Sequence, residues 1–177
     1  MPTPQLAAEG VEAKPIKQAP HPLIHWLPPL LISLAVLFTF IHFSHAHPVG
    51  TYATETDFYH LFAPDAERLA AGQFPENDFQ GPGYPALIAV VTMLTGDAFT
   101  AGKWVSIVSA ALLVLLVYVL FARLFGQWVG VGAALLFPVG AQVPQFSISA
   151  TTDINFLLLC FAALGLFTST RLSATWR

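Results

Sequence analysis

Two carboxylates separated by one residue, Glu55 and Asp57, are the side chains in this sequence whose types and spacing point most directly to chemistry. A carboxylate within hydrogen-bond reach of an acceptor hydroxyl can act as a general base. Two neighbouring carboxylates can also hold a divalent cation that neutralises a phosphate leaving group. A solvated pair that caps a helix is the alternative that the spacing leaves open.

A third carboxylate, Asp153, lies between two long apolar stretches. Ionisable groups close to membrane depth are costly and are usually paired or functional. Asp153 and Asp57 could flank one cleft, if several helices bring them to the same side. Alternatively, Asp153 caps the helix that begins at Ile154.

Histidines gather around the start of the acidic stretch. Imidazole is a common metal ligand, so a metal site is one interpretation. Their spacing matches no recognised metal pattern, and polar side chains at the end of a membrane helix are the alternative. The residues are His42, His45, His47 and His60.

The composition places the chain among membrane proteins. Hydrophobic residues make up 55% of it and charged residues only 10%, whereas soluble domains carry about 25% charged residues. The sequence has no cluster of basic residues of the kind that binds nucleic acid. The single cysteine, Cys160, cannot form a disulfide within the chain.

Four apolar windows without Asp, Glu, Lys or Arg indicate an all-α bundle of transmembrane helices. They run over 23–43, 104–122, 128–150 and 154–170, and a span needs about 17–25 residues. Eight of the ten carboxylates lie between the first and second windows or at Asp153, whereas five of the seven Lys and Arg residues lie in the other connections or the tails. Short basic loops stay on the cytoplasmic side. We therefore expect four spans, with both termini cytoplasmic, a disordered tail over 1–22 and one transmembrane domain over 23–177.

The long outer loop, 44–103, is expected to contain helices of its own. Thr54 or Thr56 can cap a helix that runs to about Ala71, where Gly72 is placed to end it. This helix would lie along the interface, and Pro64 is expected to break it into two short pieces.

A second helix of the loop, 84–95, is apolar but reaches only about 18 Å, well short of a bilayer core of about 30 Å. If it crossed the membrane, most basic residues would lie outside, against the positive-inside rule. We therefore expect it to dip into the membrane and return. The rigid turn GPGYP at 81–85 would direct the chain into it and line a cavity.

The order of these pieces resembles the N-terminal part of the GT-C glycosyltransferases, closest to the protein O-mannosyltransferase and aminoarabinose transferase branch (glycosyltransferase family 39-like). The resemblance extends over about residues 23–170. It rests on ETDFY at 55–59, DAERLAAG at 65–72, GPGYP at 81–85, LTG at 94–96, FARLFG at 121–126 and TD at 152–153.

The resemblance implies an inverting transfer of a sugar from a polyprenyl-phosphate donor to an acceptor on the outer face of a membrane, and we expect a bacterial inner membrane. It assigns the general base or acceptor-positioning role to Asp57, with Glu55 as its neighbour and Asp153 as a further carboxylate of the site. The acceptor could be a protein, a lipid or a glycan. A divalent cation, if one is needed, would bind Glu55 and Asp57.

The resemblance also implies a donor-phosphate region at the turn, which here consists of Gly81, Pro82, Gly83, Tyr84 and Pro85. Relatives often carry a lysine beside this turn. This chain has none there, so Lys103 becomes the expected phosphate partner, unless it only caps the loop electrostatically.

Two other functions are weighed against the transferase. One is a transporter or an assembly subunit, although transport sites usually lie at the bilayer midplane, where these windows carry almost no polar groups. The other is an inactive relative. Because family members usually continue through more spans, we expect the chain to be incomplete at its C-terminus.

Overall fold

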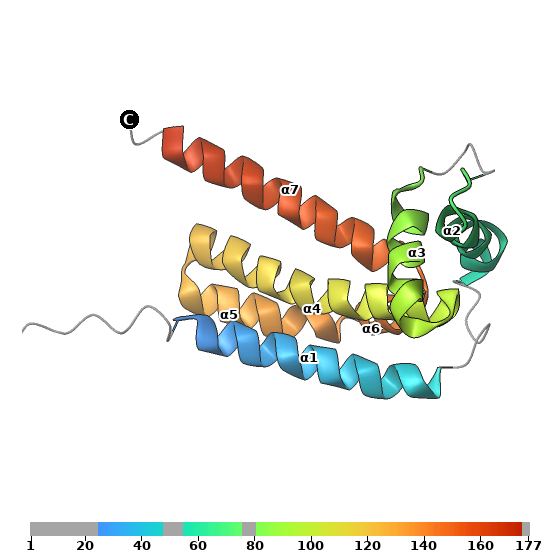
Figure 1. Cartoon of the computed structure of the whole chain (residues 1–177). Coiled ribbons are helices and arrows are strands. Elements are labelled where there is room, and N and C mark those ends of the chain that lie inside the picture. The colour runs from blue at the N-terminus through green and yellow to red at the C-terminus, as the bar shows by residue number, and fades with distance from the viewer. Residues whose placement is uncertain (1–24, 48–54, 76–80, 175–177) are drawn as a thin grey trace, which may run out of the picture.

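The computed structural model describes residues 25–47, 55–75 and 81–174, with side chains as far as Thr168. The described residues form helices joined by short connections, with no strand among them, which confirms the all-α class (Figure 1). The tail expected over 1–22 lies outside the described residues.

Helix α4 (Ala98–Phe125) is the centre of the structure, and helices α1, α3, α5, α6 and α7 all contact it. It is 28 residues long and begins six residues before the apolar window that predicts it. Many of its side chains are buried, including Ile107 and Leu113.

Helix α1 (Leu27–Ala46) begins with prolines in its first turn, where a missing N–H costs nothing. It lies along α4 (Figure 1). Its buried residues recur every three or four positions and form one stripe, whereas Leu31, Leu34 and Phe38 on its other side are exposed. An exposed apolar face on a long helix suits contact with lipid. The buried residues are Pro29, Ser33, Val36, Phe40 and Ser44.

Helix α5 (Gln127–Leu136) follows α4 after the single residue Gly126, whose φ of +98° suits glycine. The two helices pack against each other as an antiparallel pair. The chain then passes through a 3₁₀ turn, η4 (Phe137–Val139), into α6 (Gln142–Ile148), at a bend of 67°. Pro138 in η4 and Gly140 after it explain why this apolar stretch is not straight.

The first outer loop forms a layer at one end of the bundle (Figure 1). A π-helical turn, η3 (Phe58–Phe62), runs without interruption into α2 (Ala63–Ala70). The expected break at Pro64 is therefore a change of helix type. Pro64 has no N–H and its ring would clash with the carbonyl four residues back, and the wider π turn precedes it.

Gly72 ends α2 as predicted, with a φ of +74°. The N–H of Gly72 donates to Leu69 O and that of Gln73 to Arg68 O, which is the Schellman pattern. Helix α3 (Gly83–Thr95) follows and stands across the end of α4 in Figure 1. A cluster of buried side chains joins η3, α2 and α3 to α4. Its members include Phe58, Phe62, Ala66, Ile88, Ala101 and Val105.

The last helix, α7 (Asp153–Ala174), contacts α4 and diverges from it towards its own C-terminus (Figure 1). Among the described residues, α1 and α4 are long and apolar enough to cross a membrane, and the bent pair formed by α5, η4 and α6 gives a third span if it is counted as one. The described part of α7, Asp153–Thr168, is apolar but shorter than a usual span.

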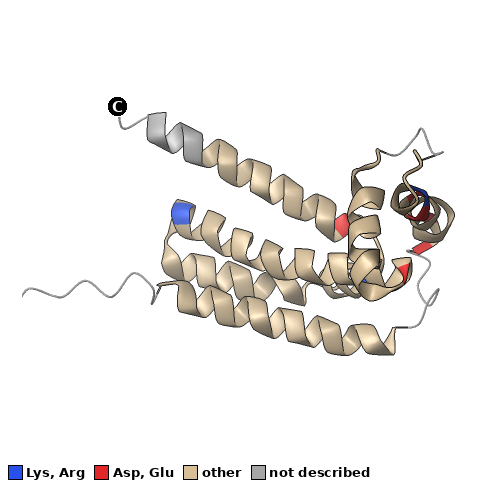
Figure 2. Cartoon of the chain, in the orientation of Figure 1, with Lys and Arg blue, Asp and Glu red and all other residues tan. Residues whose placement is uncertain are grey.

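Charge is sorted between the two ends of the bundle (Figure 2). The carboxylates of the described residues gather at the end where α2 and α3 lie, whereas Arg123, in the last turn of α4, lies at the opposite end. Of the Lys and Arg residues whose side chains are described, Arg68 in α2 and Lys103 near the start of α4 lie at the acidic end, and Arg123 lies at the opposite end. We refer to the acidic end as the outer end.

The contact between α4 and α5 predicts opposite effects for two glycines of the same helix. A Cβ at Gly130 would lie 2.7 Å from Ala122 Cβ and 2.9 Å from the Tyr118 carbonyl oxygen, whereas a Cβ at Gly132 would meet nothing within 4 Å. We expect Gly130→Ala to destabilise the protein by about 1–3 kcal/mol through overpacking. Gly132→Ala should be neutral or stabilising, because alanine favours helix. Thermal unfolding of both variants in one detergent checks this, and equal midpoints would contradict the packing.

Candidate functional site

Glu55, one of the two carboxylates of the acidic pair, is buried at the outer end, with 1% of its surface exposed. Its Oε1 atom accepts a hydrogen bond from His47 Nε2 at 2.9 Å and another from the Ala150 N–H at 2.9 Å. His47 follows the last turn of α1, and Ala150 lies in the turn between α6 and α7. One carboxylate oxygen thus joins three distant parts of the chain.

The neighbouring carbonyl of Thr151 extends this polar cluster. It accepts hydrogen bonds from the Tyr84 hydroxyl at 3.0 Å and from Ser106 Oγ at 3.3 Å. The hydroxyl of Thr151 itself is buried and has no partner among the described residues. The turn between α6 and α7 is therefore held by α3, by α4 and by Glu55.

The pKa of the Tyr84 phenol is raised in this cluster. Burial is the main cause of this increase above the usual value. The Ser106 hydroxyl opposes this change, while the negative charges of Asp153 and Glu55 raise the pKa further. Tyr84 therefore lies within electrostatic range of a carboxylate of the acidic pair and of Asp153, and it stays protonated as a hydrogen-bond donor.

Asp57 and Asp153, by contrast with Glu55, have exposed side chains. Asp57 precedes η3, and Asp153 is the first residue of α7. Both lie at the outer end of the bundle, as expected from the sequence (Figure 2). Of the predicted carboxylates, these two are accessible to a substrate.

The proline turn divides into an exposed and a buried half. Gly81, Pro82 and Gly83 are exposed, and a Cβ at either glycine would meet nothing within 4 Å. Tyr84 and Pro85 are buried in the first turn of α3. The glycines thus leave open space beside the start of this helix instead of lining the groove described below.

Lys103 is engaged with the end of α1. Its Nζ donates to the carbonyl oxygens of Ser44 at 3.1 Å and His47 at 3.4 Å, and it lies 4.9 Å from the centre of the Phe99 ring. A cation near the last carbonyls of a helix is stabilising. Lys103 thus contacts the end of α1, and phosphate binding by Lys103 stays a prediction from the sequence.

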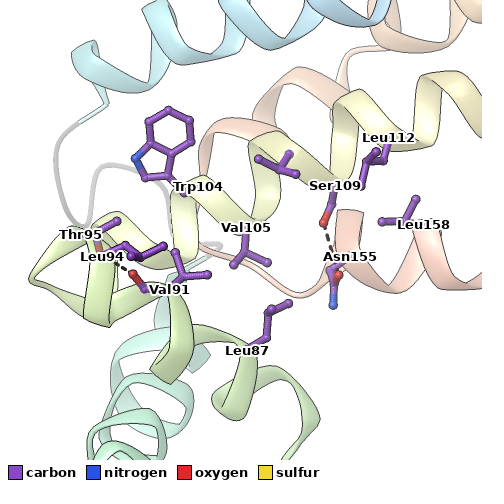
Figure 3. Close-up of a pocket in the computed structure, with 11 residues that line it drawn as sticks. Leu87, Val91, Leu94, Thr95, Trp104, Val105, Ser109, Leu112, Asn155 and Leu158 are labelled. Atoms are coloured by element: carbon purple, nitrogen blue, oxygen red, sulfur yellow. Dashed lines mark hydrogen bonds between the residues drawn. The ribbon is translucent and has the colours of Figure 1, made fainter.

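A groove of about 600 Å³ runs between α3, α4 and α7, below the polar cluster. Its lining is almost entirely apolar, as Figure 3 shows. Its polar side chains include Thr95, whose Oγ1 donates to Val91 O at 3.3 Å, and Ser109, whose Oγ donates to Asn155 Oδ1 at 3.3 Å. The Asn155 amide nitrogen points away from Ser109 (Figure 3). Residues of the groove include Leu87, Val91, Trp104, Val108, Leu112 and Leu158.

The part of the chain that the structure describes contains no group of three or more His, Cys, Asp or Glu side chains placed to hold a metal ion. Of the histidine cluster, His42, His45 and His60 are exposed, and only His47 is buried. The sequence did not predict the pairing of His47 with Glu55. The second hydrogen bond to the same carboxylate, from the Ala150 N–H, spans 95 positions and has no signature in the sequence.

Comparison with known proteins settles the family. The profile of the dolichyl-phosphate-mannose-protein mannosyltransferase family matches residues 79–176, which is more than half of the chain. The chain belongs to this family. No match was found among curated proteins or among solved structures.

Much of the candidate site lies within the part matched by the mannosyltransferase family. The proline turn, Lys103, the groove and Asp153 fall inside residues 79–176, whereas Glu55 and Asp57 precede them. The members of this family are glycosyltransferases that use a lipid-phosphate-linked sugar. Together with the candidate spans, membership in it supports an integral membrane protein. The acidic pair is joined to the matched part by the hydrogen bond between Glu55 and Ala150.

The start of α4, which carries Lys103 and Trp104, depends on a cap. Asp97 is the N-cap residue, and its Oδ1 accepts from the Thr100 N–H at 2.8 Å. Slight burial opposes the charge, but hydrogen bonds from Thr100 and Phe99 and the charge of Lys103 outweigh it, so the pKa of Asp97 is lowered.

We expect Asp97→Ala to lower the unfolding free energy by about 1 kcal/mol and Asp97→Asn, which keeps the hydrogen-bond acceptor but removes the charge, to lower it by a smaller amount at neutral pH. Because the folded-state pKa is lowered, the stabilising charge is present above the unfolded pKa of about 3.9 and is lost as the pH falls through the lower folded value. Denaturation in detergent across this pH range checks both points. Identical acid profiles for the wild type and Asp97→Asn would contradict the role of the charge.

Proposed function

We propose that the chain is a membrane glycosyltransferase, or the N-terminal part of one, that transfers a sugar from a polyprenyl-phosphate donor to an acceptor hydroxyl at the outer face. The observation that carries the proposal is the placing of two exposed carboxylates, Asp57 and Asp153, at the same end of a bundle that belongs to a mannosyltransferase family. The description of that family names a dolichyl-phosphate-linked mannose as donor.

In the proposed reaction, an acceptor oxygen attacks the anomeric carbon of the sugar as the bond from that carbon to the phosphate oxygen breaks. The lipid phosphate leaves as an anion that is already stable, and one displacement inverts the anomeric carbon. Asp57 takes the proton of the acceptor hydroxyl. The remaining task of the protein is to hold and align both substrates.

Asp153 and the proline turn complete the proposed site. The negative charge of Asp153 acts near Tyr84, next to the exposed glycines Gly81 and Gly83. We place the donor phosphate in the open space beside these glycines, where the start of α3 offers a partial positive charge. In this arrangement the positive charge of Lys103, which lies on α4 with its Nζ against the end of α1, contributes to the electrostatic field of the site.

The polyprenyl chain of the donor is proposed to lie in the groove between α3, α4 and α7. The groove is apolar and about 600 Å³ in volume. One of its lining residues, Leu87, lies about one helical turn beyond Tyr84, so we place the start of the polyprenyl chain near this residue. An isoprenoid gains from leaving water in such a groove in proportion to the apolar area it buries.

The proposed topology has four spans, in which the bent α5 to α6 unit is the third and α7 the fourth, with both termini in the cytoplasm. The sorted charges support this orientation. In the same proposal α3 dips into the outer leaflet, because its 13 residues are too short to cross. A bacterial inner membrane is the proposed location.

The transfer assay that tests this function uses the purified chain in liposomes, labelled polyprenyl-phosphate mannose and an extract of acceptors. We expect the wild type to transfer mannose and Asp57→Asn to lose about 100-fold or more of the rate, as for other general bases. Glu67→Gln, an exposed carboxylate on the following helix, is the matched control and should stay active. Full activity of Asp57→Asn would remove Asp57 from the mechanism, and an inactive wild type would contradict a self-sufficient enzyme. Arms with magnesium and with EDTA show whether a divalent cation takes part.

A further inference from the structure

Glu55 stands beside the proposed base, yet its surroundings differ from those of Asp57. We infer that Glu55 is a positioning residue, which joins the first outer loop to the turn before α7 and so places Asp57 and Asp153 relative to each other. This inference rests on the proposed function for its meaning in catalysis, but the joint itself is a property of the fold.

The burial of Glu55 argues against direct chemistry. With 1% of its surface exposed, its carboxylate has no open path to a substrate, whereas Asp57 is exposed. The oxygen Oε1 is occupied by two hydrogen bonds, from His47 Nε2 and from the Ala150 N–H, both at 2.9 Å. A general base needs an oxygen that can receive a proton from the acceptor.

The segments that Glu55 joins are the ones that carry the exposed carboxylates. Asp57 follows Glu55 by two residues in the same helical segment, and Asp153 follows Ala150 by three. Between them, Phe58 and Ala150 pack against Gly102 of α4, where even a Cβ would lie 2.7 Å from the Phe58 ring and 2.8 Å from Ala150 Cβ. The joint and this tight contact therefore hold both carboxylates against one face of α4.

The geometry makes glutamine a discriminating replacement. The amide oxygen of glutamine can accept the same two hydrogen bonds, but glutamine cannot act as a base and is a poor metal ligand. If Glu55 is a positioning residue, transfer activity is therefore retained in Glu55→Gln and lost in Glu55→Ala. If Glu55 is a base or a cation ligand, activity is lost in both variants.

The experiment measures transfer by the wild type, Glu55→Gln, Glu55→Ala and Asp57→Asn. Hydrogen exchange of the backbone over 149–152 is followed in each, because it reads the Ala150 N–H without any need for activity. If Glu55→Ala does not stay monodisperse, Glu55→Asp replaces it, since its carboxylate is one methylene shorter and cannot reach both donors.

We expect Glu55→Gln to keep transfer within about tenfold of the wild type and to keep the turn protected, since the hydrogen bonds persist in neutral form. Glu55→Ala should lower kcat by about 100-fold with a smaller effect on KM, as misplacement of catalytic groups does, and exchange at the turn should become faster. A Glu55→Gln variant as inactive as Asp57→Asn with its turn still protected would overturn the inference, and so would a protected turn in Glu55→Ala. If the wild type itself transfers nothing, the proposed function falls, and the exchange data alone then decide whether the joint exists.

Discussion

One buried carboxylate, that of Glu55, joins the segments at the outer end of this protein. Removing a charged group from water costs several kcal/mol unless it is fully hydrogen-bonded. Glu55 accepts hydrogen bonds from a side chain at the end of α1 and from a backbone N–H in the turn before α7. The geometry is demanding because both donors must reach the same oxygen. The elements that carry them are therefore fixed in one arrangement, and the exposed carboxylates Asp57 and Asp153 are fixed with them.

Helix α4 provides the frame on which this joint is built. Its outer end carries Lys103 against the carbonyls of α1 and Ser106 against Thr151, and its middle forms one wall of the apolar groove. The polar cluster and the apolar groove thus share one helix. This is the arrangement that a substrate with a charged head and a long isoprenoid tail requires, and it is the reason that a donor of this class suits the site.

The sequence predicted those features that follow from local pattern or from the bilayer. The helical class, the acidic end of the bundle and the end of α2 at Gly72 all depend on neighbouring residues or on the cost of charge in lipid. The four spans remain a prediction, because the bent α5 to α6 unit and the described part of α7 do not each form a long straight helix.

The features that the sequence could not predict depend on contacts between distant residues. Glu55 and Asp57 are equivalent in the printed sequence, but only Glu55 is buried, where it meets His47 and the Ala150 N–H, the latter 95 positions away. Likewise, the engagement of Lys103 with the end of α1 depends on how two helices meet. The π turn before Pro64 lets the helix continue past a residue that lacks an N–H, whereas the sequence predicted a break there.

The central claim is that a polyprenyl-phosphate donor binds at the outer end with its chain between α3, α4 and α7. Photo-crosslinking tests it most directly, with a polyprenyl-phosphate mannose that carries a diazirine in its first isoprene units and with the labelled peptides identified by mass spectrometry. The account predicts adducts on residues of the groove such as Leu87, Trp104 and Leu112, which unlabelled donor suppresses. Adducts that are confined to the lipid-facing surfaces of α1 and α5, or that unlabelled donor does not suppress, would contradict it.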